Sequence, residues 1–240
     1  MVFMSYELEL LINGRVCRGF VSATAGSAEQ IFKIIHNHKY AEIHMILDGG
    51  ANFLIGGKLM KFQDRDAFLI PAGVYHCCRD IGENARDIAF QVAADAGDFA
   101  VNRQPETVLG EIAREISVLG VGEGGGRLAA LLSYVGSDFF PQPKIFEMTD
   151  TAAVIHEFIS QNYNRDIKTA DLAEVLNFSE KHTERLVKRF TGVTFREALT
   201  DYRLTVADFL IKNTDMRPSA AAAYVGYSTY SGFWKARRRK

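Results

Sequence analysis

Three histidines and one glutamate in the amino-terminal half of the chain are residue types that can hold a transition metal ion. His36 and His38 lie two residues apart, and Glu42 follows four residues after His38. Because side chains alternate along a strand, we expect all three to project to one side of an unbroken strand, with His76 reaching them from a neighbouring strand. Three imidazoles and one carboxylate form a competent set for Fe, Mn, Ni or Zn.

The same four residues allow three interpretations. They could line an effector pocket that has polar walls and holds no metal, they could bind a metal, or they could be a purely structural histidine cluster. His44 lies two residues beyond Glu42 and is a further candidate for the same face. No cofactor is certain from the sequence, and a divalent transition metal is the one that these residue types would accept.

The elements that must position these side chains read as short strands. Residues 3–93 alternate apolar runs such as 42–47 and 67–70 with turn pairs such as Asn13-Gly14. This spacing predicts a small all-β sandwich or barrel. Residues 36–42, with Gly49 seven positions beyond Glu42, and residues 71–76 (PAGVYH) resemble the two motifs of the cupin family. Arg65 departs from the pattern, since the second motif usually opens with glycine. In cupin enzymes the matching residues hold a metal.

The carboxy-terminal ninety residues have a different pattern, that of paired helix-turn-helix units. In the first, residues 167–192, Thr169 is placed to cap a helix, Phe178 to fill the turn and Ser179 to cap a second helix. The expected buried face of the first helix comprises Leu172, Ala173, Val175 and Leu176. The second helix buries Thr183, Leu186, Val187 and Phe190 and leaves a charged face, which the major groove accepts.

A long helix and a second unit follow. Thr194 and Glu197 have capping-box spacing, which predicts a helix that continues to about Asn213. Pro218 suits the first turn of the next helix, a turn follows at Gly226, and a final helix begins at about Thr229.

These segments resemble the AraC/XylS family of transcription regulators over residues 150–240, through the stretches DLAEVLNFS, RLVKRFTG, TFREAL, YRLTVADFLIKNTD and AYVGYS. The resemblance implies that Lys181, Glu184 and Arg185 lie where family members reach base edges. It also implies an effector-lining role for the four cupin-motif residues. The full set expected to contact DNA is Lys181, His182, Glu184, Arg185, Lys188, Arg189, Tyr230, Ser231, Trp234 and Lys235. An alternative for Trp234 is a core position, because Arg237 stands where the family usually has an aromatic residue.

Charge and cysteine content agree with this division. Residues 151–240 hold 15 Lys and Arg against 10 Asp and Glu, whereas residues 1–150 hold 13 against 19. The basic part suits phosphate contacts, and residues 237–240 (RRRK) are candidates for them. The three cysteines, with Cys77 and Cys78 adjacent, do not form a disulfide framework; we expect ordinary reduced thiols, with a redox role as the alternative. No membrane span or export sequence is expected.

A connector joins the two parts. Residues 105–119 read as a helix in which Leu109, Ile112, Ile116 and Leu119 form a short heptad seam, and a second apolar helix covers 127–135. The seam either forms a homodimer interface or packs on the protein's own core. Residues 136–149, with two prolines, look like a stiff linker.

The sequence therefore predicts an α+β protein, mainly β in its amino-terminal half and all-α in its carboxy-terminal half. Residues 1–100 are expected to form a cupin-like effector-binding barrel, 101–149 dimerisation helices and a linker, and 150–240 a double helix-turn-helix domain. The predicted function is a cytoplasmic, homodimeric, non-enzymatic regulator of transcription that binds double-stranded DNA and senses a small molecule or metal. The alternatives are a metal-dependent cupin dioxygenase or isomerase with a helical appendage, and a DNA-binding protein whose barrel senses nothing.

Overall fold

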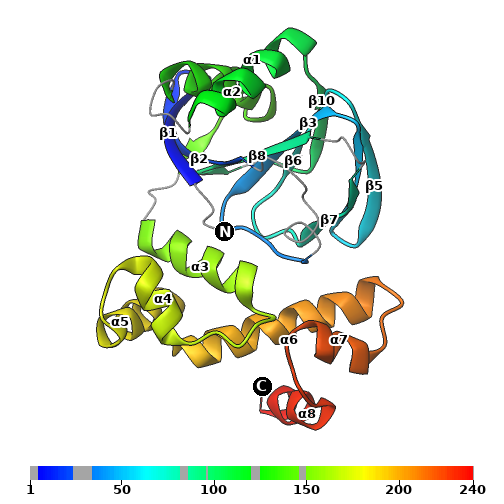
Figure 1. Cartoon of the computed structure of the whole chain (residues 1–240), viewed down its shortest axis with the longest axis vertical. Coiled ribbons are helices and arrows are strands. Elements are labelled where there is room, and N and C mark those ends of the chain that lie inside the picture. Colours follow the sequence, from blue (N-terminus) through cyan, green and yellow to red (C-terminus); the bar gives the residue numbers. More distant parts are fainter. Residues whose placement is uncertain are drawn as a thin grey trace. The chain divides into compact units, whose positions relative to one another are not determined.

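The chain divides into two compact units, Met1–Met148 and Thr149–Lys240. The computed structural model describes residues 5–23, 34–81, 86–95, 97–119, 125–145 and 150–239. The first unit carries all the strands and the second is entirely helical, as the ribbon shows (Figure 1). Within the described ranges, none of the helices has both the length and the hydrophobicity needed to cross a membrane. The prediction of a sheet-rich half followed by a helical half is confirmed.

The first unit is built on a six-stranded antiparallel sheet and a smaller three-stranded one. The large sheet, in spatial order, contains β1 (Ser5–Ile12), β2 (Arg15–Ala23), β8 (Arg86–Val92), β3 (Ala41–Asp48), β6 (Asp66–Ile70) and β10 (Ala100–Arg103). The small sheet contains β5 (Lys58–Gln63), β4 (Gly50–Ile55) and β7 (His76–Ile81). A short pair joins β9 (Ala94–Asp95) to β11 (Lys144–Ile145). An aromatic cluster of Phe53, Phe62 and Phe68 packs among strands of both sheets.

The strands do not close into the predicted barrel. Among the described residues, β1 pairs only with β2 and β10 only with β6, so the large sheet keeps two edges. A helix occupies the β1 edge: the Leu11 N–H donates to Ser133 Oγ at 2.9 Å, and the Asn13 side chain donates to the Phe140 carbonyl at 2.8 Å. Because these groups already have partners, the edge is protected without closure of the sheet.

Two helices, α1 (Glu106–Leu119) and α2 (Gly125–Phe139), cover the large sheet. Leu109 and Ile112, from the predicted dimer seam, are 3% and 0% exposed and belong to the core of this unit. Burial of each such side chain contributes about 1.5–3 kcal/mol to folding. These seam residues therefore pack on the protein's own sheet rather than waiting for a second subunit. The side chain of Leu119 lies outside the described residues, and a homodimer stays a prediction.

The predicted linker is partly ordered structure. Helix α2 continues to Phe139, and Lys144 and Ile145 pair with Asp95 and Ala94 in the small β11–β9 ladder. Residues 146–149 of the predicted linker lie outside the described residues.

The described residues of the second unit, 150–239, form six helices: α3 (Asp150–Asn162), α4 (Thr169–Leu176), α5 (Glu180–Thr191), α6 (Phe195–Asn213), α7 (Pro218–Tyr224) and α8 (Tyr230–Arg238). Local sequence explains most of their ends. Ser179 Oγ accepts the His182 N–H and caps α5, and Thr194 and Glu197 form the predicted capping box of α6. Asn177 ends α4 with φ 55°, the left-handed conformation that asparagine tolerates.

For helix α4 of the first helix-turn-helix unit, the predictions for two residues are wrong. Thr169 is not a cap: helix α4 begins at this residue, and the Lys168 N–H is held instead by Asp171 Oδ2 at 2.7 Å. Val175, expected in the buried face of α4, is 58% exposed. Leu172 and Ala173 are the fully buried residues of α4.

Candidate metal centre and nucleic-acid interface

The four predicted metal-ligating residues come together, although they do not share one unbroken strand. Glu42 is the second residue of β3 and His76 is the first of β7, while His36 and His38 precede β3. A pair of backbone hydrogen bonds joins His36 to His76, at 3.0 and 2.8 Å. This bridge brings the segment before β3 to the end of the small sheet, so both histidines can face Glu42.

The donor atoms of His36, His38, Glu42 and His76 all lie within 4.8 Å of one another. His38 Nε2 and His76 Nε2 are 3.1 and 3.0 Å from Glu42 Oε2. The His36 and His76 rings are in contact, with centroids 4.4 Å apart. His38, Glu42 and His76 are buried, and His36 is half-buried. The cluster is thus compact and shielded, and its donor atoms are close enough together to share one ion.

Backbone carbonyls determine which nitrogen of each ring is available. His36 Nδ1 lies 2.8 Å from the Ile34 carbonyl, and His76 Nδ1 lies 2.9 Å from the Val74 carbonyl. A carbonyl only accepts, so each Nδ1 must carry a proton and donate it. In a neutral ring this leaves Nε2 with a lone pair that faces the cluster, which is how outer partners orient histidine ligands of metals.

Charge in the cluster also fits a cation. Burial, together with the neighbouring histidines, holds the pKa of His36 well below its usual value, and burial lowers the pKa of His76. Burial alone would raise the pKa of Glu42, but His38 and His44 outweigh it and hold that pKa well below its usual range. A neutral His76 therefore presents a lone pair to the Glu42 carboxylate at 3.0 Å. A cation between them would convert this repulsion into two bonds.

Residues on β8 support the cluster, and the sequence analysis did not identify them. Gln91 is paired with Glu42 across β3 and β8, and its amide lies 2.9 Å from His38 Nδ1. Asp87 Oδ2 lies 2.9 Å from His44 Nδ1. Asp87 was detectable in principle, because it is an acidic residue next to the apolar run of residues 88–90. Its contact with His44 was not detectable, because that contact depends on the pairing of β3 with β8.

The cysteines show no feature of a redox site. Cys17, Cys77 and Cys78 are buried, and no disulfide joins them. Burial raises the pKa of Cys77 and that of Cys17 to about 11, so both remain thiols at neutral pH. The thiolate is the reactive form, and the structure therefore favours ordinary strand residues.

The predicted DNA-binding face of α5 is largely exposed. Lys181, Arg185, Lys188 and Arg189 lie on the surface, while Thr183 and Val187 are buried on the opposite side. Arg185 donates to His182 Nδ1 at 2.6 Å and so is held against the half-buried ring. This face of α5 is cationic, and each successive turn of the helix presents a long basic side chain. Such side chains can reach both base edges and phosphates.

Glu184 departs from the predicted role of a base contact. The Thr169 hydroxyl donates to its Oε2 at 3.1 Å, and the Phe195 N–H donates to its Oε1 at 3.2 Å. Both carboxylate oxygens are therefore engaged within the domain, where they join the starts of α4 and α6 to α5.

The α8 face separates into a core residue and an exposed set. Phe233 is fully buried, whereas Tyr230, Ser231, Trp234 and Lys235 are exposed, with Trp234 at 41%. Phe233, and not Trp234, therefore occupies the core position on this helix. Arg237 is not part of a loose tail: it pairs with Asp208 of α6 at 2.7 Å and lies over the Trp234 ring. Arg238 and Arg239 are exposed, and Lys240 lies outside the described residues.

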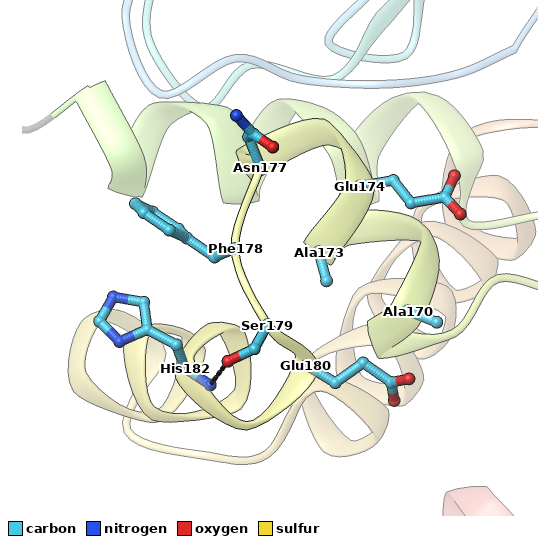
Figure 2. Close-up of a pocket in the computed structure, with 8 residues that line it drawn as sticks. All are labelled: Ala170, Ala173, Glu174, Asn177, Phe178, Ser179, Glu180 and His182. Carbon is cyan, nitrogen blue, oxygen red and sulfur yellow. Dashed lines mark hydrogen bonds between the residues drawn. The ribbon is translucent and has the colours of Figure 1, made fainter.

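A groove lies between α4 and the first turn of α5 (Figure 2). Its lining comprises Ala170, Ala173, Glu174, Asn177, Phe178, Ser179, Glu180 and His182. Two carboxylates in this lining would repel phosphates. Phe178, predicted to fill the turn, is instead 48% exposed and contacts the His182 ring. We therefore place phosphate contact on the exposed basic side of α5 rather than in this groove.

Comparison with known proteins identifies the second unit. A family described as a helix-turn-helix domain matches residues 172–240. No curated protein matches the chain. Among similar solved structures, the C-terminal domain of AraT, a response regulator from Geobacillus stearothermophilus, is 25% identical; the match covers 39% of this chain and 78% of that one, with a TM-score of 0.37.

Two further solved structures are similar. ToxT from Vibrio cholerae O395 is 14% identical, and the match covers 84% of this chain and 86% of ToxT with a TM-score of 0.35. A DNA-binding transcriptional dual regulator from Escherichia coli K-12 is 21% identical, with 37% and 85% covered and a TM-score of 0.34. The family match spans α5 and α8 with the long helix between them, in the order that the sequence predicted. Residues 172–240 therefore form a helix-turn-helix domain, in agreement with the AraC-type resemblance of the sequence.

Proposed function

We propose that this chain is a transcription regulator that binds double-stranded DNA through the exposed faces of α5 and α8 and binds a divalent transition metal ion in its sheet-rich unit. The observation that carries the proposal is the coexistence of a helix-turn-helix domain with the compact donor cluster of His36, His38, Glu42 and His76. Lys181, Arg185, Lys188 and Arg189 of α5 would contact DNA, together with Tyr230, Ser231, Trp234 and Lys235 of α8.

The donor set supports a metal in preference to an organic effector. Two histidines already have Nδ1 bound to carbonyls, and the four donor atoms are close enough together to share one ion. A bound ion would supply positive charge to the buried carboxylate and would link β3, β7 and the segment before β3. The alternative of a metal-dependent enzyme would leave the helix-turn-helix domain without a role.

A metal-dependent change in DNA affinity tests the regulatory part of the proposal. The whole protein would be stripped with a chelator and titrated with Zn²⁺ or Co²⁺, and its affinity would be measured by fluorescence anisotropy on DNA selected from a random library. Coupling between two sites is typically about 1–3 kcal/mol, so the affinity should change by roughly 5- to 150-fold. Mg²⁺ serves as the control, because it prefers oxygen ligands. An unchanged affinity at saturating Zn²⁺ and Co²⁺ would contradict the proposal.

Arg185→Ala tests base reading by α5. An arginine that binds a guanine bidentately contributes about 1–3 kcal/mol of discrimination, so the variant should bind the selected DNA more weakly and lose preference at one base pair. Lys188→Ala is the matched control on the same helix; as a phosphate contact it should weaken binding equally on all sequences and lower the log–log salt slope by roughly 1. If Arg185→Ala also weakened all sequences equally, Arg185 would be a phosphate contact.

A further inference from the structure

A buried histidine–aspartate pair lies directly behind the candidate metal ligands and is not part of the donor cluster. We infer that His44 and Asp87 position the Glu42 carboxylate for the metal, and that His44 is not itself a ligand. This inference rests on the metal site proposed above. The pair forms a continuous chain from the metal ligand into the core: Glu42 Oε2 to His44 Nε2 at 3.0 Å, and His44 Nδ1 to Asp87 Oδ2 at 2.9 Å.

The topology places these three side chains on one face of the large sheet. Glu42 and His44 are two residues apart on β3, so their side chains point to the same side. Asp87 is the cross-strand partner of Ile46 on β8, two residues further along that side. The row Glu42, His44 and Asp87 is therefore fixed by strand register, and no loop movement is needed to assemble it.

Both ring nitrogens of His44 are engaged by carboxylate oxygens, which accept hydrogen bonds and do not donate them. Neither nitrogen belongs to the donor cluster of His36, His38, Glu42 and His76, so a metal held there would not need His44 as a ligand. His44, Asp87 and Glu42 are 2%, 4% and 5% exposed, so water does not compete for the contacts. Between them, the Asp87 and Glu42 carboxylates overcome the effect of burial and raise the pKa of His44 to about 10.

Aromatic packing holds the His44 ring in this orientation. The ring stacks on Phe68 with centroids 5.1 Å apart and an interplanar angle of 8°, and it meets Phe53 edge-on at 4.9 Å. Phe68 is stacked in turn on Phe62 at 3.7 Å. A ring confined on its faces and bonded at both nitrogens cannot turn, and so it fixes the position of Glu42 Oε2.

A purely structural role is a poor explanation for this pair. Replacing a buried pair of this kind with apolar side chains of similar volume is often neutral for stability or even stabilising. A role in positioning a ligand explains the pair better. Mutation of a residue that holds a metal ligand in place typically lowers the metal affinity by 10- to 100-fold.

The test is a Co²⁺ titration of the whole protein, followed by visible absorption, in Asp87→Asn, His44→Gln and the wild type. Asp87→Asn keeps the shape of the side chain and removes its charge. Asp138→Asn is the control, since Asp138 accepts a hydrogen bond from Gln104 at 3.0 Å elsewhere in the same unit. We expect one Co²⁺ per chain in all four proteins, the same absorption bands, and affinity lowered 10- to 100-fold in Asp87→Asn and His44→Gln only.

Each other result overturns the inference in a distinct way. If both variants keep wild-type affinity, the pair only fills the core, whatever it does to thermal stability. If His44→Gln shifts the Co²⁺ absorption bands, His44 is a ligand and not a positioning residue. If the wild type binds no Co²⁺, the proposed metal site fails along with the inference. Should His44→Gln not fold, Asp87→Asn against Asp138→Asn still decides the question.

Discussion

Replacing Gly226 by alanine should lower the melting temperature of the second unit by on the order of 10 °C or more and abolish DNA binding. Gly226 has φ +89°, and a Cβ at this position would lie 2.6 Å from the Asn164 carbonyl oxygen. The left-handed conformation costs an alanine about 1–2 kcal/mol, and overpacking against backbone costs roughly 1–3 kcal/mol more. For a unit of this size, each kcal/mol corresponds to about 4–8 °C.

The contact matters for function because it lies at a junction of the second unit. Arg203 of α6 donates to the carbonyls of Tyr163 and Arg165, on either side of Asn164, and lies over the Tyr227 ring. The turn after α7 thus rests on the segment after α3. Forcing these two apart would move α8 relative to α5, and under the proposed function both helices contact the DNA together.

Gly192→Ala is the matched control for this prediction. Gly192 also has a left-handed φ, +81°, but no atom lies within 4 Å of the position its Cβ would take. The Gly192→Ala variant should lose only the stability that the left-handed backbone conformation costs an alanine, and it should keep measurable DNA binding. Thermal unfolding by circular dichroism and anisotropy on selected DNA provide the two readouts. Equal losses in the two variants would show that the Asn164 contact has no effect of its own.

Local sequence rules were sufficient for most helix boundaries of the second unit. Ser179, Thr194 and Pro218 act within one turn of their own position, so their residue types predict the starts of α5, α6 and α7. Glu184 shows where such rules fail. Its spacing on α5 is that of a base contact, but its carboxylate binds Thr169 and Phe195, residues that only the fold brings near it.

In the first unit, the sequence indicated strands but not how the sheet ends. Alternation of apolar residues specifies one face of each strand, whereas closure depends on what covers the edges, and here Ser133 of α2 covers β1. The predicted seam has the same limitation. A 3-4 spacing shows that α1 has an apolar stripe, but it does not show what covers that stripe. A second subunit could do so, whereas in the structure Leu109 and Ile112 pack in the protein's own core.

The donor cluster was predictable because its motifs are compact in sequence, with His36, His38 and Glu42 within seven residues. His76 required the cupin resemblance, since it joins the others only through the small sheet. The positioning pair was beyond sequence reasoning for a physical reason: Asp87 meets His44 through the register of β3 and β8.

His76→Ala should abolish both metal binding and the effect of metal on DNA affinity. The variant removes one of the three imidazoles and leaves the buried Glu42 carboxylate without this neighbour. The loss of metal affinity should therefore exceed the 10- to 100-fold that is typical when a residue behind a metal ligand is mutated. Without differential binding of the metal, the coupling to DNA falls to zero, so Zn²⁺ should leave the affinity unchanged. The affinity of the metal-free variant should equal that of the metal-free wild type, because α5 and α8 belong to the other compact unit.

Cys77→Ala is the control, since Cys77 is the next residue of the same strand, is equally buried and contributes no donor atom to the cluster. It should retain metal binding and the metal-dependent change in DNA affinity, which excludes a general disturbance of β7. A His76→Ala protein that still changes its DNA affinity with Zn²⁺ would place the metal response elsewhere in the chain. The four converging residues would then be a polar cluster of the fold without a regulatory role.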